Sequence, residues 1–278
     1  MDTTRPAEGN VFVLRTCDKD GKSFGGFQWP REGEVCATDW KQTAECGNGL
    51  HGLARGVGDG GHLYSDDDAL WLVVEVAEES LIDLSGKVKF PRGTVRYCGE
   101  RETATRIIKH AHPDAAVCYA TVTGGDFATV TGGDGANVSG GYRATVSGGD
   151  FATVSGGYRA TVTGGEGATV SGGDFATVSG GDFATVTGGE GATVTGSEGA
   201  TVSGGDFATV TGGDFATVSG GDFATVSGGV GAMLTLCYYD KRKRARVFYV
   251  GEDGIKPNTP YKLDKNNNPM EVLDNGKA

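Results

Sequence analysis

The chain has 278 residues, of which 50 are glycine and only seven are proline, and its formal net charge is −11. The scarcity of proline excludes a collagen or a proline-rich linker as the source of the glycine. The acidic balance argues against direct binding to nucleic acid or to an anionic membrane. The length predicts two or three structural units.

Membrane and export signals are not evident in the sequence. No apolar run reaches the roughly 18 residues that a membrane-spanning helix needs. The first ten residues, MDTTRPAEGN, are polar and lack the apolar segment of a secretory signal. We therefore expect a soluble intracellular protein.

Residues 1–111 have an ordinary composition and predict an α+β domain. The predicted strands are rich in apolar and β-branched residues and span residues 11–15, 69–76, 87–90 and 94–98. A helix is predicted over residues 100–112, where apolar side chains recur at helical spacing. The intervening segment is irregular and rich in glycine.

Four segments of this domain resemble segments of a known family. They are RTCDKDGKSFGGFQWP, CGNGLHGL, LWLVVEV and GKVKF. They resemble a phage and prophage domain family of unknown function, whose members often carry glycine-rich arrays. The resemblance implies a viral or prophage protein, located in the cytoplasm of a bacterial host or associated with a virion. It implies no activity.

Enzymatic chemistry has only weak candidates in this domain. Arg15 on the first strand, His51 in GLHG and Glu75 on a later strand are loosely similar to the catalytic residues of ADP-ribosyltransferases. No phosphate-binding loop, nucleophile elbow or dinucleotide fingerprint accompanies them. We therefore expect a protein that is not an enzyme, with an ADP-ribosyltransferase-like activity as one alternative.

The sequence also predicts neither a metal nor a cofactor. Cys36, Cys46, His51 and His62 could in principle hold zinc. However, none of the six cysteines forms a C-x-x-C pair, so buried free thiols are the expectation.

Residues 120–231 consist of fourteen octapeptides without insertion or deletion, preceded by a predicted cap at residues 112–119. Ala always holds position one, Val position three, and Ser or Thr position four; Thr holds position two except at Asn137. This alternation predicts a strand with one buried face. Positions five and six are Gly except at Ser197, and we expect the pair to form a corner through positive φ. The array predicts an all-β solenoid with two strands and about 16 residues per coil.

Alternate octads are expected to stack on the same face of this solenoid. One face then presents a regular row of threonines: Thr129, Thr145, Thr161, Thr177, Thr193, Thr209 and Thr225. Such T-x-T arrays resemble the ice-binding surfaces of β-solenoid antifreeze proteins, and the octads are similar to the short repeats of the grass proteins. Ice binding is therefore a second functional hypothesis.

Position seven predicts an acidic edge beside the same coils. Six acids follow one another there, with three phenylalanines beside them: Asp134, Asp150, Glu166, Asp182, Glu198, Asp214, Phe151, Phe183 and Phe215. Carboxylates one coil apart repel one another, so we expect cations or a basic partner to offset them. The leading hypothesis is a non-catalytic phage protein that binds a protein partner with a basic surface. That partner would be a host defence protein, a nucleic-acid-binding protein displaced by mimicry, or a virion component, and homo-oligomerisation stays open.

Residues 232–278 are predicted to form a C-terminal cap, a β-hairpin and a polar tail. The basic cluster KRKRAR at 241–246 directly follows the acidic array, and we expect it to cap the solenoid or to remain solvated.

Overall fold

The computed structural model describes residues 5–64 and 66–272. These residues form two compact units. One unit contains the chain up to residue 121 together with residues 131–136, and the other contains residues 122–130 and the chain from residue 137 onwards.

The first unit is built on a seven-stranded antiparallel sheet of order β2-β7-β4-β1-β3-β6-β5. Its strands are β1 Asn10–Cys17, β2 Gly33–Cys36, β3 Leu50–Ala54, β4 Leu70–Ala77, β5 Ile82–Asp83, β6 Val88–Phe90 and β7 Arg92–Gly99. Two single 3₁₀ turns, η1 Gly60–His62 and η2 Glu78–Ser80, lie in the connections. The central strand β4 is the apolar run LWLVVEVA, and it pairs with β1 and β7 along most of its length.

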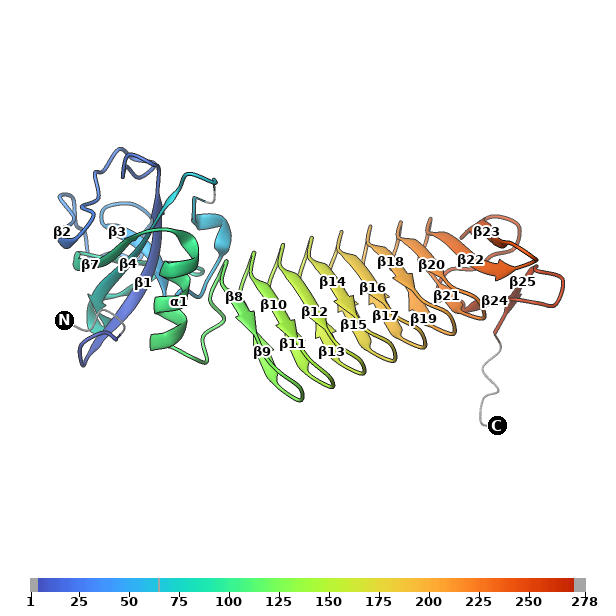
Figure 1. Cartoon of the computed structure of the whole chain (residues 1–278). Helices are drawn as coiled ribbons and strands as arrows, with labels where there is room; N and C mark the ends of the chain where they lie inside the picture. Colours follow the sequence, from blue (N-terminus) through green and yellow to red (C-terminus); the bar gives the residue numbers. More distant parts are fainter. Residues whose placement is uncertain (1–4, 65, 273–278) are drawn as a thin grey trace, which may run out of the picture. The chain divides into compact units, whose positions relative to one another are not determined.

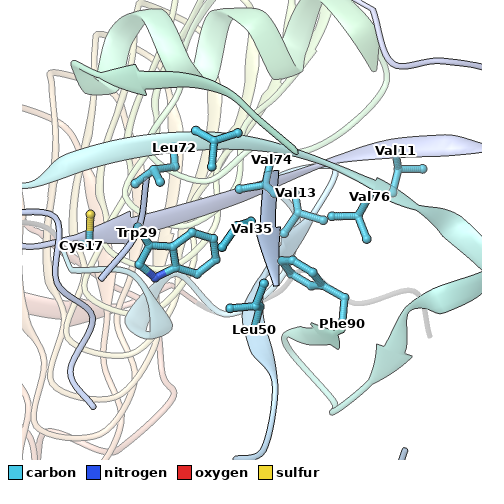
Figure 2. Packing of buried hydrophobic residues seen from close by; sticks show 11 residues of the cluster. Val11, Val13, Cys17, Trp29, Val35, Leu50, Leu72, Val74, Val76 and Phe90 are labelled. Carbon is cyan, nitrogen blue, oxygen red and sulfur yellow. The ribbon is translucent and has the colours of Figure 1, made fainter. Parts of the chain in front are cut away.

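Each face of this sheet is covered differently. Helix α1, Arg101–Ala111, packs against β1, β4 and β7 on one face and buries Ala104 and Ile108 (Figure 1). On the other face, side chains from β1 and β4 pack with Trp29, Leu50 and Phe90 in an apolar cluster (Figure 2). The unit is therefore a β-sheet domain with a single helix among the described residues, and the expected α+β class is wrong. The glycine-rich segment between β1 and β4 supplies the strands β2 and β3 rather than further helices.

The octapeptides form a β-solenoid of about seven turns with roughly 16 residues each, as predicted (Figure 1). One sheet contains β8 Thr121–Thr123, β10 Asn137–Gly140, β12 Thr153–Gly156, β14 Thr169–Gly172, β16 Thr185–Gly188, β18 Thr201–Gly204 and β20 Thr217–Gly220. The other contains β9 Thr129–Thr131, β11 Thr145–Ser147, β13 Thr161–Thr163, β15 Thr177–Gly180, β17 Thr193–Gly196, β19 Thr209–Thr211 and β21 Thr225–Ser227. Equivalent octad positions pair in parallel, as between Val178 and Val194.

Four further strands extend the two sheets at the C-terminal end. The first sheet gains β22, Met233–Tyr239, which pairs in parallel with β20, and β23, Lys243–Tyr249, which pairs antiparallel with β22. The second sheet gains β24, Tyr261–Leu263, and β25, Pro269–Glu271, both antiparallel. The basic residues Lys243 and Arg244 are exposed on β23. Arg244 forms an ion pair with Asp240 at 3.6 Å.

The solenoid interior consists almost entirely of Ala at position one and Val at position three. Ala176 and Val178 are typical, with exposures of 0% and 1%. Backbone hydrogen bonds between coils continue around the corners: Thr177 N donates to Ala160 O at 2.9 Å, and Phe183 N donates to Glu198 O at 2.8 Å. Because the corners are also paired, this thin core is combined with a nearly continuous backbone ladder.

The glycine pair has a different role from the one expected. Positive φ occurs at position eight, as at Phe183 with φ 56°, and not at positions five and six. At position five a Cβ on Gly180 would lie 2.5 Å from Val186 Cγ2 and 2.8 Å from the Cβ of Ala184. Glycine is therefore required at position five because the interior leaves no space for a side chain.

Candidate functional site

The outward residues of the second sheet form a regular hydroxyl surface. We call it the regular face and define it as positions two and four of β9, β11, β13, β15, β17, β19 and β21. The predicted threonines of position two all lie on it, and six of them are exposed while Thr225 is half-buried. In-register parallel pairing places equivalent side chains about 4.8 Å apart between coils and roughly 6.6 Å apart along a strand. The structure thus brings all seven predicted threonines together in one grid.

Hydroxyl groups at position four link neighbouring coils. Ser179 Oγ donates to Thr163 Oγ1 at 3.3 Å, and the hydroxyls of Thr211 and Ser227 lie 3.0 Å apart. These contacts restrict the rotamers along the edge of the regular face. These position-four side chains are therefore ordered from one coil to the next.

The two outward surfaces differ in composition. The opposite surface, the second face, comprises positions two and four of β8, β10, β12, β14, β16, β18 and β20. Threonine occupies 11 of the 14 sites on the regular face but eight of 14 on the second face, where Asn137 also interrupts the row. The regular face therefore presents more methyl groups beside its hydroxyls.

The acidic edge has a structural role that the sequence analysis missed. Oδ1 of Asp150 accepts the amide hydrogen of Glu166 at 2.8 Å, and Asp182 accepts that of Glu198 at 3.2 Å. Each aspartate thus satisfies a backbone donor one coil further along, at the exposed corner. Asp134 accepts a hydrogen bond from Gly60 N at 3.0 Å within the first unit. The repeated aspartates therefore have backbone partners inside the chain, while the expected cations or basic partner stay a prediction.

Large residues at position eight are unexpected, since the backbone there is left-handed. Phe151, Phe183 and Phe215 have φ values of 55–56° and are 64–69% exposed. Gly199 holds the equivalent position in the next coil, and a Cβ added to it would lie 2.7 Å from the ring of Phe183. Each of these rings therefore lies over a glycine. The strict alternation of Phe and Gly at position eight along this edge was the sequence signal for that packing.

The three weak catalytic candidates do not form one site. Arg15 Nη1 donates to the backbone oxygen of His51 at 3.2 Å, so these two residues are neighbours. In the pairing of β1 with β4, Arg15 lies opposite Leu72, whereas Glu75 lies opposite Phe12. Because strand residues alternate between faces, Arg15 and Glu75 point to opposite sides of the sheet.

Glu75 is instead a structural carboxylate. Its side chain is 5% exposed and accepts hydrogen bonds from Ala7 N at 2.8 Å and Asn10 Nδ2 at 2.7 Å, and it pairs with Arg96. Burial by itself raises the pKa of Glu75, but the hydrogen bonds and the Arg96 charge outweigh burial and hold the pKa below its ordinary value. An ionised Glu75 therefore fastens the segment before β1 to the sheet.

The six cysteines are free thiols, and Cys98 and Cys237 are half-buried. Cys17 and Cys118 are buried, and burial raises the pKa of each thiol to about 11, whereas Cys36 and Cys46 are exposed. Among the described residues, no group of three or more His, Cys, Asp or Glu side chains is arranged to hold a metal ion. No helix in the described part of the chain is long and apolar enough to cross a membrane.

The N-terminal unit matches a domain family whose function is unknown. Residues 11–110 match the family described as "Domain of unknown function (DUF7666)". A domain of unknown function joined to a repeat solenoid is thereby confirmed. No solved structure matches the chain.

The similar curated proteins are bacterial ice nucleation proteins. The chain is 41% identical over 96 residues to one from Xanthomonas campestris pv. translucens, an alignment that covers 34% of this chain and 6% of that protein. It is 38% identical over 113 residues to InaU of Pantoea ananas, covering 40% and 11%, respectively. An ice nucleation protein of Pseudomonas syringae is 39% identical over 108 residues, covering 38% and 9%. The chain thus spans about a tenth or less of the length of these relatives.

These similarities correct two expectations. The leading hypothesis of a phage protein that binds a basic partner is wrong, since the relatives are ice nucleation proteins and none is described as viral. The same finding contradicts the expected location in the host cytoplasm or on a virion. The comparisons instead favour the ice-binding alternative.

Proposed function

We propose that the regular face of the solenoid binds ice by holding a layer of ordered water against its threonine grid. The observation that carries the proposal is the unbroken row of seven threonines at position two on a solenoid whose relatives are ice nucleation proteins. We do not extend the full activity of those much longer proteins to this chain. What is proposed is a water-ordering surface.

The chemistry of threonine suits this role. Its hydroxyl group donates and accepts hydrogen bonds, while its methyl group adds apolar area that does not compete for them. In the grid, hydroxyls repeat at about 4.8 Å across the coils and roughly 6.6 Å along each strand. A regular lattice of hydroxyl and methyl groups can order the adjacent waters, whereas charged side chains would hold them in ionic shells. The acids lie at the corners, away from positions two and four.

Rigidity supports the proposal as well. Each strand of the regular face is hydrogen-bonded to its neighbours in register, and hydroxyls at position four bond from coil to coil. Ordering the surface on contact with ice therefore costs little side-chain entropy. A flexible polar loop with the same composition would lack this advantage.

The size of the face indicates adsorption to existing ice rather than efficient nucleation. Seven strands at about 4.8 Å per step give a face roughly 30 Å long. A template of this size contacts only a small ice embryo, whereas adsorption to a growing crystal requires only that many copies pin its surface. We therefore expect inhibition of ice growth and recrystallisation as the main activity.

The test uses two paired variants of the full chain. Thr161→Tyr with Thr193→Tyr places bulky rings on the regular face, and Thr153→Tyr with Thr185→Tyr does the same on the second face. All four threonines are exposed, so both variants should retain the fold. Thermal hysteresis and ice-recrystallisation inhibition should be lost in the first variant and largely kept in the second.

Two outcomes would reject the proposal. One is a folded wild-type chain that causes no hysteresis and no inhibition of recrystallisation. The other is equal activity in the wild type and in the regular-face variant, provided that circular dichroism shows an unchanged β spectrum.

A further inference from the structure

The first unit contains a pocket that the proposed ice-binding role does not use. It has a volume of about 770 Å³ and is formed by β1, β3 and the loops at residues 23–29, 37–49 and 61–63. Small-molecule sites commonly have volumes of roughly 300–1,000 Å³. The pocket is therefore large enough for an organic ligand of moderate size.

Two residues that line this pocket each have a buried hydrogen-bond donor without a partner. In the described part of the chain, the buried side-chain atoms without a hydrogen-bond partner are Arg15 Nε, Trp29 Nε1 and His112 Nε2, and the first two belong to residues that line the pocket. Trp29 is only 3% exposed, and the Arg15 guanidinium lies 5.6 Å from its ring centre. A buried donor without a partner costs about 1–3 kcal/mol. Two such donors on one pocket indicate that a ligand supplies an acceptor.

The charge of the lining favours an anionic acceptor. Arg15 and Lys87 contribute permanent positive charge, and Asp39 is the one acid among the described lining residues. In the described structure, no carboxylate forms an ion pair with Arg15. His51 adds no charge at neutral pH, because burial and then the charges of Lys87, Arg15 and Lys89 lower its pKa to about 4. His62 also lines the pocket, and its Nε2 lies 3.5 Å from Oδ2 of Asp59, a residue outside the lining.

One wall of the pocket is held in place by a buried lysine. Lys89 is fully buried, and its Nζ donates to Glu45 O at 2.9 Å and to Gly47 O at 3.4 Å, with the Trp40 ring centre 5.6 Å away. The neighbouring Gly47 amide donates to His51 Nε2 at 3.4 Å. The loop therefore keeps its shape without a ligand, as a preformed site requires.

The lining of the pocket also includes an exposed aromatic ring. Phe24 is fully exposed although it lines the pocket, and it lies beside Gly25 and Gly26 on the loop that leads to Trp29. A free phenyl ring next to an anion-binding cavity offers a stacking surface for a planar group. The combination calls for a ligand that carries both a negative charge and an aromatic ring.

We propose that this pocket binds a mononucleotide, whose phosphate accepts hydrogen bonds from Arg15 and Trp29 and whose base stacks on Phe24. The phosphate satisfies both unpaired donors and the positive charge, and the remaining volume of the cavity accommodates the base. Binding at this site is independent of the threonine grid, so the failure of either proposal leaves the other standing.

Isothermal titration calorimetry of the full chain with AMP, ADP, adenosine and inorganic phosphate tests the proposal. AMP or ADP should bind, and both adenosine and inorganic phosphate should bind at least about tenfold more weakly, which corresponds to the loss of one strong interaction. Arg15→Gln and Trp29→Phe should each weaken nucleotide binding about tenfold or more. The matched control Arg92→Gln, which removes an exposed arginine on β7, should leave binding unchanged.

Phe24→Ala keeps the test decisive if the buried variants fail to fold, because Phe24 is exposed and makes no core contact. It should weaken nucleotide binding roughly fivefold while leaving binding of inorganic phosphate unaltered. No detectable heat with AMP or ADP at millimolar concentration would overturn the proposal. Equal affinities for AMP and adenosine, or for the wild type and a folded Arg15→Gln variant, would overturn it as well.

Discussion

The sheet of the first unit and the solenoid reach stable structures by different means. The sheet buries large side chains such as Phe12, Leu72 and Phe90, each with 0% exposure. The solenoid buries only Ala and Val along most of its length and relies on backbone pairing from coil to coil. A fold held by its backbone and by two inward positions leaves the outward positions of every strand available for another role. The threonine grid occupies those positions.

Truncating a large core residue of the sheet should have the largest effect on stability. Leu72→Ala should lower the free energy of unfolding of the first unit by about 2–5 kcal/mol, because it leaves a cavity among large neighbours. All three tryptophans, at positions 29, 40 and 71, lie in this unit, so tryptophan fluorescence during denaturation follows it selectively. Val178→Ala is the matched solenoid variant and should leave the fluorescence transition unchanged. A shift of that transition by Val178→Ala would show that the sheet and the solenoid do not unfold independently.

The buried carboxylate of the sheet should give a pH-dependent effect of slightly smaller size. Glu75→Gln removes the charge that pairs with Arg96 and should cost roughly 1.5–3 kcal/mol at pH 7. The folded-state pKa of Glu75 is depressed, so its contribution is present above the unfolded pKa of about 4.3 and is lost as the pH falls through the folded value. The difference between wild type and variant should therefore shrink below about pH 4. A difference that stays constant down to the acid transition would contradict this assignment.

Adding a single carbon to the solenoid interior should be costly. Gly180→Ala should destabilise the solenoid by about 1–3 kcal/mol through overpacking against Val186 and Ala184. Ser197→Gly is the control at position six, where the chain itself carries a side chain, and should change stability little. Far-UV circular dichroism during thermal unfolding measures both. Equal stability of Gly180→Ala and wild type would show that the interior is looser than the geometry indicates.

The smallest expected effect separates ring packing from backbone strain at position eight. Phe183→Ala loses the ring over Gly199 but keeps a side chain at positive φ, whereas Phe183→Gly loses the ring and relieves the strain. The glycine variant should therefore be more stable than the alanine variant by roughly 1 kcal/mol. Denaturation of the two variants side by side gives this difference, and the reverse order would rule out left-handed strain at this corner.

The structure of the solenoid could be predicted from the sequence in more detail than the structure of the sheet domain. The fixed phase of Ala and Val through fourteen octads predicts both the strand alternation and the 16-residue coil, because a period of two defines which side chains point inward. The strands β1, β4, β6 and β7 were also predicted from their apolar runs. β2 and β3 were missed because the segments GEVC and LHGLA are short and contain glycine, and their pairing partners lie far along the chain.

The candidate site was predictable in composition but not in detail. The threonine row follows from the period alone, whereas the amide that each aspartate accepts depends on corner geometry that no residue pattern reveals. The left-handed backbone at Phe183 is a further case, because sequence reasoning assigns such conformations to glycine. The pocket around Arg15 and Trp29 was missed because its lining residues come from separated loops.

Adsorption to ice tests the central claim most directly. A fluorescently labelled chain is included in a slowly grown single ice crystal, together with the regular-face variant Thr161→Tyr/Thr193→Tyr and, separately, the second-face variant Thr153→Tyr/Thr185→Tyr. The account predicts that the wild type and the second-face variant enter the ice on defined crystal planes, while the regular-face variant is excluded into the liquid. Exclusion of the folded wild type, or incorporation of all three proteins alike, would contradict it.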